Sequence, residues 1–575
     1  MWKFINQYVK KYWLIYSFGF VALTATNLAA VRIPLEIKAI IDGLKTNDHS
    51  DLKRFVLVIV GLSAIIFISR TLSRLFFFIP GRNVEFDIRN DLYKHLIRLS
   101  PRFYKENKVG DLMSRLVNDL SGIRVFVALA ALHIFNTTIS YIFVFSEMIK
   151  ISLPLTLYVI APIPLAMFGI RFLVKKLFIY MVRYQKLLGE VTDKIVEALS
   201  NIHLIKSYGI EDSTLSMFKE KNEEFLENGI NLAKYRSSMF PFIGIIGSLG
   251  QCILFFVGGL WIIKDQLTIG DFTAMSLFLA QIVWPTASLA WIINIIQRGR
   301  TSLKRVNKIL DEPEYYRPED KQNIDIDNNA MSVKNLTFSF PDSKTPALND
   351  VSFDIPKHSS IGFFGPTGCG KTTLAKILAG LETPPKNSVF LNYQDITSIP
   401  IATYWGLISY VPQLSFLFSD TITENIGYAN QKFESPNKDI IEKLSKASSV
   451  YNDVMAFPDD FETIIGEKGI ILSGGQKKRI SLARALYKKH SILILDDHLS
   501  AVDHKTEHFI NKAIYELELK TKIVVSHRIS ALVDCDNILV LENGKIVNQG
   551  SHKELIKKEG LYKDTWLYQQ VEEQN

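Results

Sequence analysis

Hydrophobic residues are concentrated in the first half of the chain, where they form six runs with almost no charge. A helix of about 20 apolar residues crosses a bilayer core of about 30 Å. One such run could be a buried helix of a soluble protein, but six of them before Arg298 predict six membrane spans. The runs are Trp13–Val31, Phe55–Ser69 continuing through Arg70 and Arg74 to Pro80, Val125–Ser146, Ile151–Ile170, Met239–Ile263 and Phe272–Gln297.

The polar segments between these runs alternate in length. Those after the first, third and fifth runs are short: Asp42–Arg54, Glu147–Lys150 and Lys264–Asp271. Those after the second and fourth runs are long, helical in pattern and rich in Lys and Arg: Gly81–Arg124 and Arg171–Ser238. Because positive charge marks the cytoplasmic side, we expect the long segments, the N-terminus and the C-terminal half of the chain in the cytoplasm.

Each long segment is expected to contain two helical extensions joined by a short crossing piece. Ser100–Val109 is rich in helix breakers and is the candidate for the first crossing. Arg183–Gly189 is a weaker candidate for the second. Met1–Tyr12 combines lysines with aromatic and aliphatic residues, which is typical of an interfacial helix rather than a cleavable signal peptide.

The pattern changes after Arg298. Asp311–Asn329 is polar, charged and proline-bearing, which indicates a linker. Beyond it, short apolar runs alternate with helical patterns, and this alternation predicts an α/β domain with a largely parallel sheet. The predicted strands include Ser360–Phe364, Leu407–Val411, Ile492–Leu495 and Lys522–Ser526. We therefore expect an all-α membrane domain at 1–305, a linker at 306–330 and an α/β domain at 331–575.

Composition adds little to this division. Hydrophobic residues make up 48% and charged residues 22%, and the formal net charge is +8. Such a charge could suit nucleic acid, but the cytoplasmic edge of a membrane protein explains it better. The cysteines Cys252, Cys369 and Cys535 form no metal-like cluster and no even disulfide set, as expected for a domain in a reducing cytosol.

A phosphate-binding loop follows the first of these four strands. The chain fits G-x-x-x-x-G-K-S/T after a buried strand and before a helical pattern. Glycines let several backbone N–H groups point at one phosphate, and the helix N-terminus adds partial positive charge. We expect Lys371 to reach the β- and γ-phosphates and Thr372 to ligate Mg²⁺. The loop residues are Gly365, Pro366, Thr367, Gly368, Cys369, Gly370, Lys371, Thr372 and Thr373.

A carboxylate for the metal follows another strand. Ile492–Leu495 is a buried run that ends at Asp496, as in the Walker-B motif of P-loop enzymes. Four aliphatic residues and an acid are common by themselves. Downstream of a P-loop they predict Asp496 as a Mg²⁺-side ligand.

Leu472–Gln476 reads LSGGQ and resembles the signature motif of ATP-binding cassette (ABC) proteins. Ser473, Gly474, Gly475 and Gln476 begin a helical pattern, which suits a second anion site. The resemblance implies that this site closes over the γ-phosphate held by a partner chain, so that two ATP molecules are sandwiched head to tail. ATP and Mg²⁺ are the implied cofactors.

Other residues occur in the order of the same family. Phe340 stands where an aromatic ring stacks on adenine, although a core strand aromatic is the alternative. Gln413 resembles the Q-loop residue that contacts Mg²⁺ and couples to the membrane helices. Gly466–Gly469 is similar to the exporter loop that touches the coupling helices. Ser500–Asp503 resembles the D-loop, with Asp503 as a candidate nucleotide-site residue, and His527 resembles the switch histidine.

The resemblance extends over the membrane half. Gly110–Asp119 is similar to the GD-x-x-SR-x-x-ND pattern of exporter-type membrane domains, and Glu197 and Lys206 match another stretch of that domain. The order of the two domains is that of a half-transporter. The implied fold is a type I exporter-like helical domain fused to a P-loop domain of ABC type. The implied partners are a second half-transporter, membrane lipid and a small-molecule or lipid substrate.

The chain departs from the family at one carboxylate. The family follows the Walker-B Asp with Glu, the base for the attacking water, whereas Asp497 stands here. Asp is one methylene shorter, about 1.5 Å, and a misplacement of that order can cost about 100-fold in rate. The pocket could instead relax around Asp497. We expect a slow site and favour a heterodimer with a Glu-bearing partner over a homodimer.

Three functions remain open at this stage. The leading one is ATP-driven export of a lipophilic or amphipathic compound across a bacterial cell membrane. Import of a metal chelate and lipid flipping or ATP-gated regulation are the alternatives. The predicted spans exclude a soluble nucleic-acid ATPase. Trp284 and Trp291 lie seven positions apart and could line an apolar cavity or pack between helices, while Arg32, Glu36, Lys38 and Glu147 lie near the interface.

Overall fold

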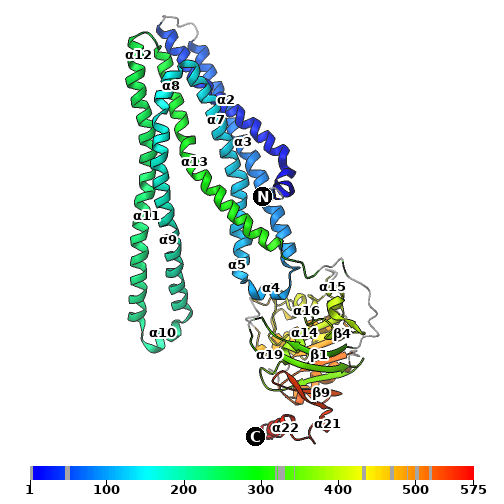
Figure 1. Cartoon of the computed structure of the whole chain (residues 1–575). Coiled ribbons are helices and arrows are strands. Elements are labelled where there is room, and N and C mark those ends of the chain that lie inside the picture. Colours follow the sequence, from blue (N-terminus) through cyan, green and yellow to red (C-terminus); the bar gives the residue numbers. More distant parts are fainter. Residues whose placement is uncertain are drawn as a thin grey trace. The chain divides into compact units, whose positions relative to one another are not determined.

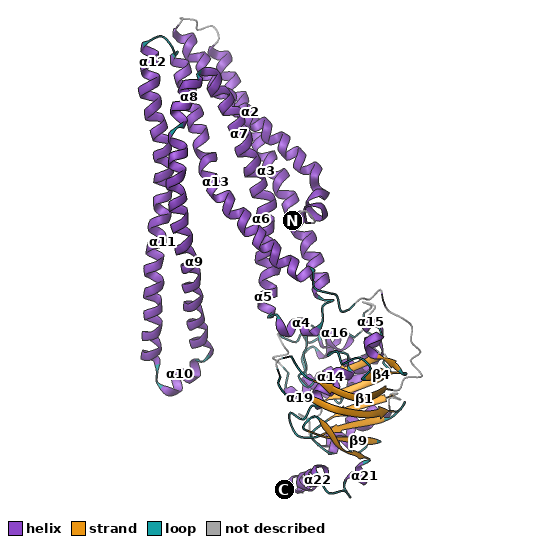
Figure 2. Ribbon diagram, viewed as in Figure 1, coloured by secondary structure: helices purple, strands orange, loops and turns teal. Residues whose placement is uncertain are grey.

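The computed structural model describes residues 4–45, 52–316, 320, 331–341, 343–429, 435–466, 472–488, 490–498, 504–516 and 521–574. They form two compact units. Unit 1 comprises Met1–Lys94 and Gly110–Asp311, and unit 2 comprises His95–Val109 and Glu312–Asn575. Figure 1 labels the elements, and Figure 2 shows that unit 1 is helical while the strands belong to unit 2. The predicted domain boundaries stay predictions, because 317–319 and 321–330 lie outside the described residues.

Unit 1 consists of long helical rods. Within the described residues, four of them are long and apolar enough to cross a membrane: Ile5–Leu44, Lys53–Leu96, Val109–Ile151 and Ile269–Leu310. Gly247–Ile263 is a shorter apolar helix within the fifth predicted span, and the fourth predicted span contains the junction between α8 and α9 at Ala161. The elements are η1 (Ile5–Val9), η2 (Lys10–Tyr12), α2 (Trp13–Lys45), α3 (Leu52–Leu96), α5 (Val109–Ser114), η3 (Arg115–Asp119), α6 (Leu120–Val125), η4 (Phe126–Ala130), α7 (Ala131–Ile151), α8 (Leu153–Ile160), α9 (Pro162–Ser200), α10 (Ile202–Tyr208), α11 (Glu211–Ile253), η5 (Leu254–Gly258), α12 (Gly259–Ile263) and α13 (Ile269–Leu310).

The second crossing piece lies elsewhere than predicted. Arg183–Gly189 is inside the continuous helix α9, so that prediction was wrong. The turn is made by α10 between Asn201, which leaves helical geometry, and Gly209, which has a φ of 61°. A residue with positive φ ends a helix, and glycine adopts it without steric cost. Figures 1 and 2 show α9 and α11 side by side with α10 at their joined ends.

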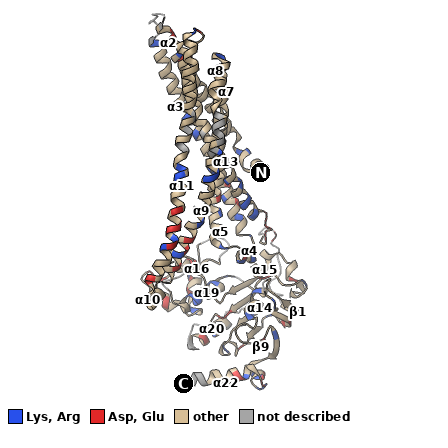
Figure 3. Ribbon diagram, turned by 60° about the vertical axis from the view of Figure 1, so that its left-hand side comes forward, with Lys and Arg blue, Asp and Glu red and all other residues tan. Residues whose placement is uncertain are grey.

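Charge is distributed unevenly along these helices. Figure 3 shows acidic and basic residues on α11 toward α10, whereas the parts of α11, α8 and α2 at the other end are mostly uncharged. This separation agrees with long cytoplasmic extensions on apolar spans. A buried cluster of the apolar part joins α7, α8, η5 and α13 and includes Met148, Val159 and Phe278.

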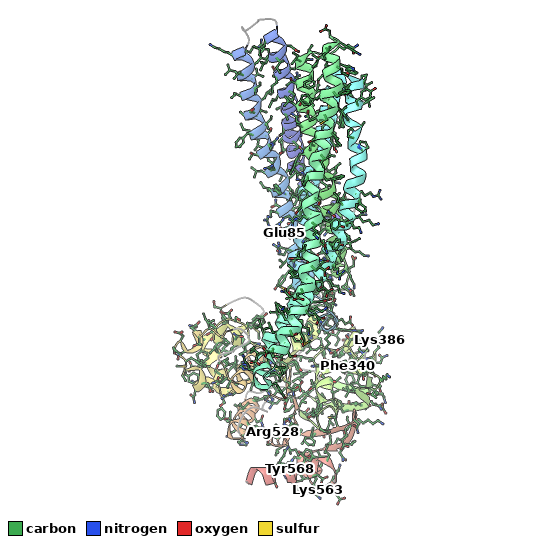
Figure 4. The ribbon with its side chains drawn as sticks, turned by 90° about the vertical axis from the view of Figure 1, so that its left-hand side faces the viewer. Glu85, Phe340, Lys386, Arg528, Lys563 and Tyr568 are labelled. Carbon is green, nitrogen blue, oxygen red and sulfur yellow. The ribbon has the colours of Figure 1, made fainter. Side chains whose placement is uncertain are left out.

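The charged part of unit 1 has its own buried polar network. Glu85 of α3, labelled in Figure 4, is only 5% exposed. Its carboxylate pairs with Arg89 at 2.7 Å, Arg124 at 3.0 Å and Arg82 at 3.3 Å. The Arg124 pair ties α3 to α6.

The described part of unit 2 contains two sheets. The larger has strand order β10-β9-β3-β8-β7-β6, and the smaller has the order β2-β1-β4-β5. In the larger sheet β9, β3, β8, β7 and β6 are mutually parallel and β10 is antiparallel. The strands are β1 (Met331–Phe338), β2 (Leu348–Ile355), β3 (Ser360–Phe364), β4 (Val389–Leu391), β5 (Gln394–Asp395), β6 (Ile408–Val411), β7 (Ile492–Asp496), β8 (Thr521–Val525), β9 (Asn537–Glu542) and β10 (Lys545–Gly550).

The central strands β3, β7 and β8 are buried at every position, as apolar parallel strands covered on both faces must be. Hydrophobic clusters occupy the two faces of this sheet, and a third cluster includes Leu417, Ile441 and Ile480. The helical elements are α4 (Pro101–Glu106), α14 (Lys371–Leu378), η8 (Ile396–Ser398), α15 (Ile401–Leu407), α16 (Ile422–Gly427), α17 (Lys438–Ala447), α18 (Tyr451–Val454), η9 (Asp460–Glu462), α19 (Gly474–Tyr487), α20 (His504–Glu516), η11 (Ser530–Leu532), α21 (His552–Leu555) and α22 (Leu561–Gln574).

The first crossing piece forms where it was predicted and belongs to unit 2. Ser100 caps α4 and Pro101 begins it. The backbone N–H groups of Tyr315 and Tyr316 donate to the Arg98 carbonyl at 2.8 and 2.9 Å, and the Tyr316 ring stacks on Trp405. The segment before β1 thus holds the crossing piece against the rest of unit 2.

One close helix contact gives a stability test. A Cβ on Gly299 of α13 would lie 2.4 Å from the Cβ of Phe126. Because the Cβ of Phe126 is attached directly to the backbone, it can move aside only if its helix shifts. We expect Gly299→Ala to lower the thermal unfolding midpoint by several degrees, for an overpacking cost of about 1–3 kcal/mol. Gly189→Ala in α9 is the control, since its Cβ meets nothing within 4 Å. Equal midpoints for the two variants would contradict this packing.

Candidate functional site

The candidate site lies at one edge of the large sheet. The strands β3, β8, β7 and β6 are parallel neighbours, so their carboxyl ends meet at the same edge. The P-loop follows β3, His527 follows β8, Asp496 ends β7, and Gln413 follows β6. Residues distant in sequence are thereby gathered by strand order alone.

Two glycines of the P-loop are required by geometry. Gly365 has a φ of 152°, and a Cβ there would lie 2.2 Å from the Leu541 carbonyl oxygen. Gly370 has a φ of 106°, and its Cβ would lie 2.6 Å from the Ala347 carbonyl oxygen. Any larger residue would force the loop off the sheet. The backbone therefore keeps the tight curl that points N–H groups at a phosphate.

Lys371 begins α14 and its ammonium group turns back across this loop. It donates to the carbonyl oxygens of Gly365 at 2.7 Å and Pro366 at 2.9 Å. The helix N-terminus and the ammonium group thus face the same small volume, which suits a polyphosphate.

Asp496 is fully buried and held by two hydroxyl groups. Thr372 Oγ1 donates to Oδ1 at 3.1 Å and the Tyr410 hydroxyl donates to Oδ2 at 3.0 Å. Burial raises the pKa of the Asp496 carboxyl, and the two hydrogen bonds lower it in part. Burial also raises the pKa of Tyr410, so its hydroxyl stays protonated and remains a donor.

This oxygen set fits Mg²⁺. Hydroxyl, carboxylate and amide oxygens are hard ligands, and Mg²⁺ in nucleotide sites takes one or two protein ligands together with phosphate oxygens and water. No cluster of three His, Cys, Asp or Glu side chains within the described residues could hold a metal alone. Thr372, Asp496 and Gln413 would hold the ion together with the nucleotide, and the ion would neutralise phosphate charge.

Asp497 is the meeting point of the candidate catalytic groups. Its carboxylate accepts from Gln413 Nε2 at 3.4 Å on Oδ2, and Oδ1 lies 3.1 Å from His527 Nδ1. Its backbone is left-handed, with a φ of 50°, and its N–H donates to the Val525 carbonyl at 2.9 Å. Lys478 of α19 donates to its carbonyl oxygen at 2.8 Å. Gln413, Asp497 and His527 are thus brought together, and their catalytic roles stay predictions.

Phe340, labelled in Figure 4, follows β1. The Phe338 ring meets it edge to face with centroids 5.2 Å apart, and Lys105 of α4 places its ammonium group 5.2 Å from the ring centre. Lys105 also forms an ion pair with Glu382. The first crossing piece therefore contacts the ring expected to stack on adenine.

The signature residues form a separate site. Ser473 caps α19 in a reciprocal box with Gln476, and Gln476 Nε2 donates to Asp453 at 3.0 Å. Among the described residues, no hydrogen bond or ion pair joins Ser473–Gln476 to the P-loop. Asp503 and residues 467–470 lie outside the described residues.

Sequence reasoning missed three residues at this site: Tyr410, Lys478 and Lys105. The neighbouring strand gave a signal for the first, because Tyr410 pairs in register with Ile494 of β7, close to Asp496. Lys478 lies one helical turn after the signature glycines, but nothing in its neighbourhood indicates a bond to Asp497. The contact of Lys105 with Phe340 joins positions far apart in sequence.

Comparison with known families decides the identity. The ABC transporter transmembrane region matches residues 16–286, and the ABC transporter domain matches residues 348–500. The chain belongs to the ABC transporters. A probable multidrug resistance ABC transporter ATP-binding/permease protein of Bacillus subtilis, YheI, is 32% identical over 99% of this chain and 97% of its own length. The multidrug resistance-like ATP-binding protein MdlA of Escherichia coli is 29% identical over 99% and 96%.

The fold agrees with this family. The solved structure of a bacterial Atm1-family ABC exporter with ATP bound covers 98% of this chain and 99% of its own, with a TM-score of 0.82 and 23% identity. This ABC transporter chain therefore has the exporter-type helical domain and the α/β nucleotide-binding domain. It is a multi-pass membrane protein that binds ATP, couples its hydrolysis to transport, and works as part of a dimer.

The Tyr410–Asp496 bond predicts a pH dependence. An ionised Asp496 is needed to bind Mg²⁺, so Mg²⁺-dependent nucleotide affinity falls as the pH drops through the raised pKa of this carboxyl. Tyr410→Phe removes a bond that lowers this pKa, so the loss should begin at a higher pH. At acidic pH we expect about fivefold weaker Mg²⁺-dependent binding of a fluorescent ATP analogue to Tyr410→Phe than to the parent chain, and little difference at neutral pH.

The control is Tyr393→Phe, at a side chain that is 96% exposed. It should behave as the parent chain at both pH values. Equal pH profiles for Tyr410→Phe and Tyr393→Phe would show that the hydroxyl group does not tune Asp496.

Proposed function

We propose that this chain is the slow-site half of a heterodimeric exporter for lipophilic or amphipathic compounds. The observation that carries the proposal is the carboxylate of Asp497. It stands in place of the Glu that the family resemblance implies, one methylene shorter, and its two oxygens already face Gln413 and His527. A base in that position reaches less far toward a water in line with the γ-phosphate.

The roles of the other residues follow from their places. The P-loop N–H groups and Lys371 would bind the phosphates, Phe340 would stack on adenine, and Thr372, Asp496 and Gln413 would hold Mg²⁺. Ser473–Gln476 would close over the nucleotide of the partner, as the family resemblance implies, since among the described residues their hydrogen bonds are not to the chain's own P-loop. Asp503, by resemblance, would complete the site across the interface.

The relatives support the substrate class. Proteins similar along nearly the whole chain are named for multidrug resistance. Import of a metal chelate and lipid flipping by the same architecture remain the alternatives. The structure offers no observation that favours either.

The purified full chain tests the slow site. In nanodiscs we expect little ATPase activity from the chain alone, and a rise of about tenfold or more in Asp497→Glu, because the longer side chain regains reach. Lys371→Ala should abolish nucleotide binding and serves as the background control. Fast turnover by the unmodified chain, or no gain in Asp497→Glu with nucleotide binding intact, would contradict the proposal.

In a heterodimer, the P-loop and the signature motif of this chain would belong to two different ATP sites, one slow and one competent. The competent site would combine the partner's P-loop with Ser473 of this chain, so Ser473→Ala should remove most ATPase activity of the co-purified dimer. Lys371→Ala, which damages only the slow site, should leave most of it. Equal loss in both variants would indicate a homodimer or two equivalent sites. Ser473 also caps α19, so the thermal midpoint of each variant is measured alongside.

A further inference from the structure

The loop that carries His527 is bound by a helix that lies outside the nucleotide motifs. This loop, residues 526–530, follows β8, and the Nδ1 atom of His527 lies 3.1 Å from the carboxylate of Asp497. The His527 side chain is 52% exposed, so packing around the ring does little to fix its direction. The direction of the imidazole toward Asp497 therefore depends on the backbone that bears it.

Gln569 of α22 binds this backbone with both ends of its side-chain amide. Its Nε2 donates to the His527 carbonyl oxygen at 3.1 Å, and its Oε1 accepts from the Ile529 N–H at 3.0 Å. Figure 4 labels Arg528, which lies between the two bonded residues, and Tyr568, which precedes Gln569 on α22. Only this orientation of the amide places a donor on the carbonyl and an acceptor on the N–H, so both of its ends are matched.

The packing of α22 keeps Gln569 in this place. Tyr562, Trp566 and Gln569 are four and three positions apart, so they share one face of the helix. The Tyr562 ring is buried and meets Phe364 edge to face, with centroids 5.2 Å apart. The Nδ1 atom of His552 lies 2.8 Å from the Tyr562 hydroxyl, and its ring packs against Trp566. Because Phe364 ends β3, α22 is fixed to the sheet that bears the nucleotide site.

The same loop also contacts α20. The Ser530 hydroxyl donates to Glu507 Oε1 at 3.0 Å, and the Arg528 guanidinium lies 3.8 Å from Glu507 Oε2. Ile529 is fully buried in the hydrophobic cluster on that face of the sheet. These contacts fix residues 528–530. The bond from Gln569 differs from them, because it acts on the carbonyl group of His527 itself.

We propose that Gln569 is a positioning residue for His527 in ATP hydrolysis. Its amide holds the peptide group that follows His527, and this group sets the direction of the imidazole toward Asp497. A side chain 42 positions later in the chain thus contributes to the rate of hydrolysis through His527. The proposal rests on the predicted role of His527 as the switch histidine and goes beyond the slow site, because it assigns a function to α22.

ATP hydrolysis by the full chain in nanodiscs tests this role. Gln569→Met keeps the length of the side chain but neither hydrogen bond, and we expect it to lower kcat about tenfold. The KM for ATP should change less than about twofold, because the P-loop and Phe340 follow other strands. Gln570→Met, at an exposed position of the same helix, is the matched control and should behave as the parent chain. An unchanged kcat in Gln569→Met, or an equal fall in Gln570→Met, would overturn the proposal.

A double-mutant cycle separates positioning from a general loss of stability. Single-turnover hydrolysis of radiolabelled ATP is used, since it resolves the rate of a slow site. His527→Ala should lower this rate, and Gln569→Met should lower it less than about twofold further in that background. A further loss of about tenfold would show that Gln569 acts otherwise than through His527 and would overturn the proposal. An unchanged rate in His527→Ala would also overturn it.

A second variant keeps the test independent of how well Gln569→Met folds. Gln569→Glu keeps an acceptor for the Ile529 N–H but places a carboxylate against the His527 carbonyl, so its kcat should fall at least as far. The thermal unfolding midpoint of every variant is measured, and Gln569→Glu takes the place of Gln569→Met if the latter is unfolded. A parent-like kcat in folded Gln569→Glu would overturn the proposal.

The outcome is separate from that of the slow-site proposal. Each rate is compared within one background, either the parent chain or Asp497→Glu, and we expect the loss caused by Gln569→Met in both. Fast turnover by the parent chain would contradict the slow site alone, because the ratio of the two rates would be unaffected. A loss absent from both backgrounds would overturn the role of Gln569 alone.

Discussion

The carboxyl edge of four parallel strands is the constraint on which the nucleotide site depends. Because β3, β8, β7 and β6 are neighbours and run in one direction, the segments after them meet at one edge whatever their distance in sequence. The strands are fixed by apolar clusters on both faces, so the edge is rigid. The polar groups on the loops are therefore positioned by the packing of the apolar strands, although these groups are not part of that packing. If β7 were not next to β8 in the sheet, Asp497 would be separated from His527. Each sequence motif would be unchanged, but the residues would no longer form one site.

Local signals in the sequence predicted the parts of the fold that are made locally. The predicted strand Ser360–Phe364 has the same bounds as β3. A largely apolar run directly before a glycine-rich loop predicts a buried strand with little ambiguity. The two crossing pieces show where prediction from local sequence succeeds and where it fails. Ser100 and Pro101 gave an N-cap with proline in the first turn, and α4 begins there. For the second crossing the decisive signal was Gly209, whose left-handed conformation ends α10, while the predicted segment in α9 contains no residue that must break a helix.

What the sequence could not provide is the set of partners for each polar group. Asp496 was predictable as an acid at the end of a buried strand, but its bond from Tyr410 depends on the order of β6 and β7. The same holds for Asp497. Its identity raised the question of a slow site, yet only the structure shows Gln413 and His527 on its two oxygens and a left-handed backbone beneath it. Asp adopts that conformation more readily than most residues, so the shorter side chain suits the turn while it shortens the reach.

Charged residues on α3 of unit 1 are of two kinds: some belong to a buried ion-pair network, and others have no acidic partner among the described residues. Glu85 is buried, and three arginines surround it; removing any partner would leave charge unpaired in a poorly solvated place, so this network belongs to the packing of α3 against α6. Arg70 and Arg74 lie farther into the apolar part of the same helix and have no such partner among the described residues. The ion pairs that hold α3 in place are therefore those at Glu85, because its carboxylate is buried and joins α3 to α6 through Arg124.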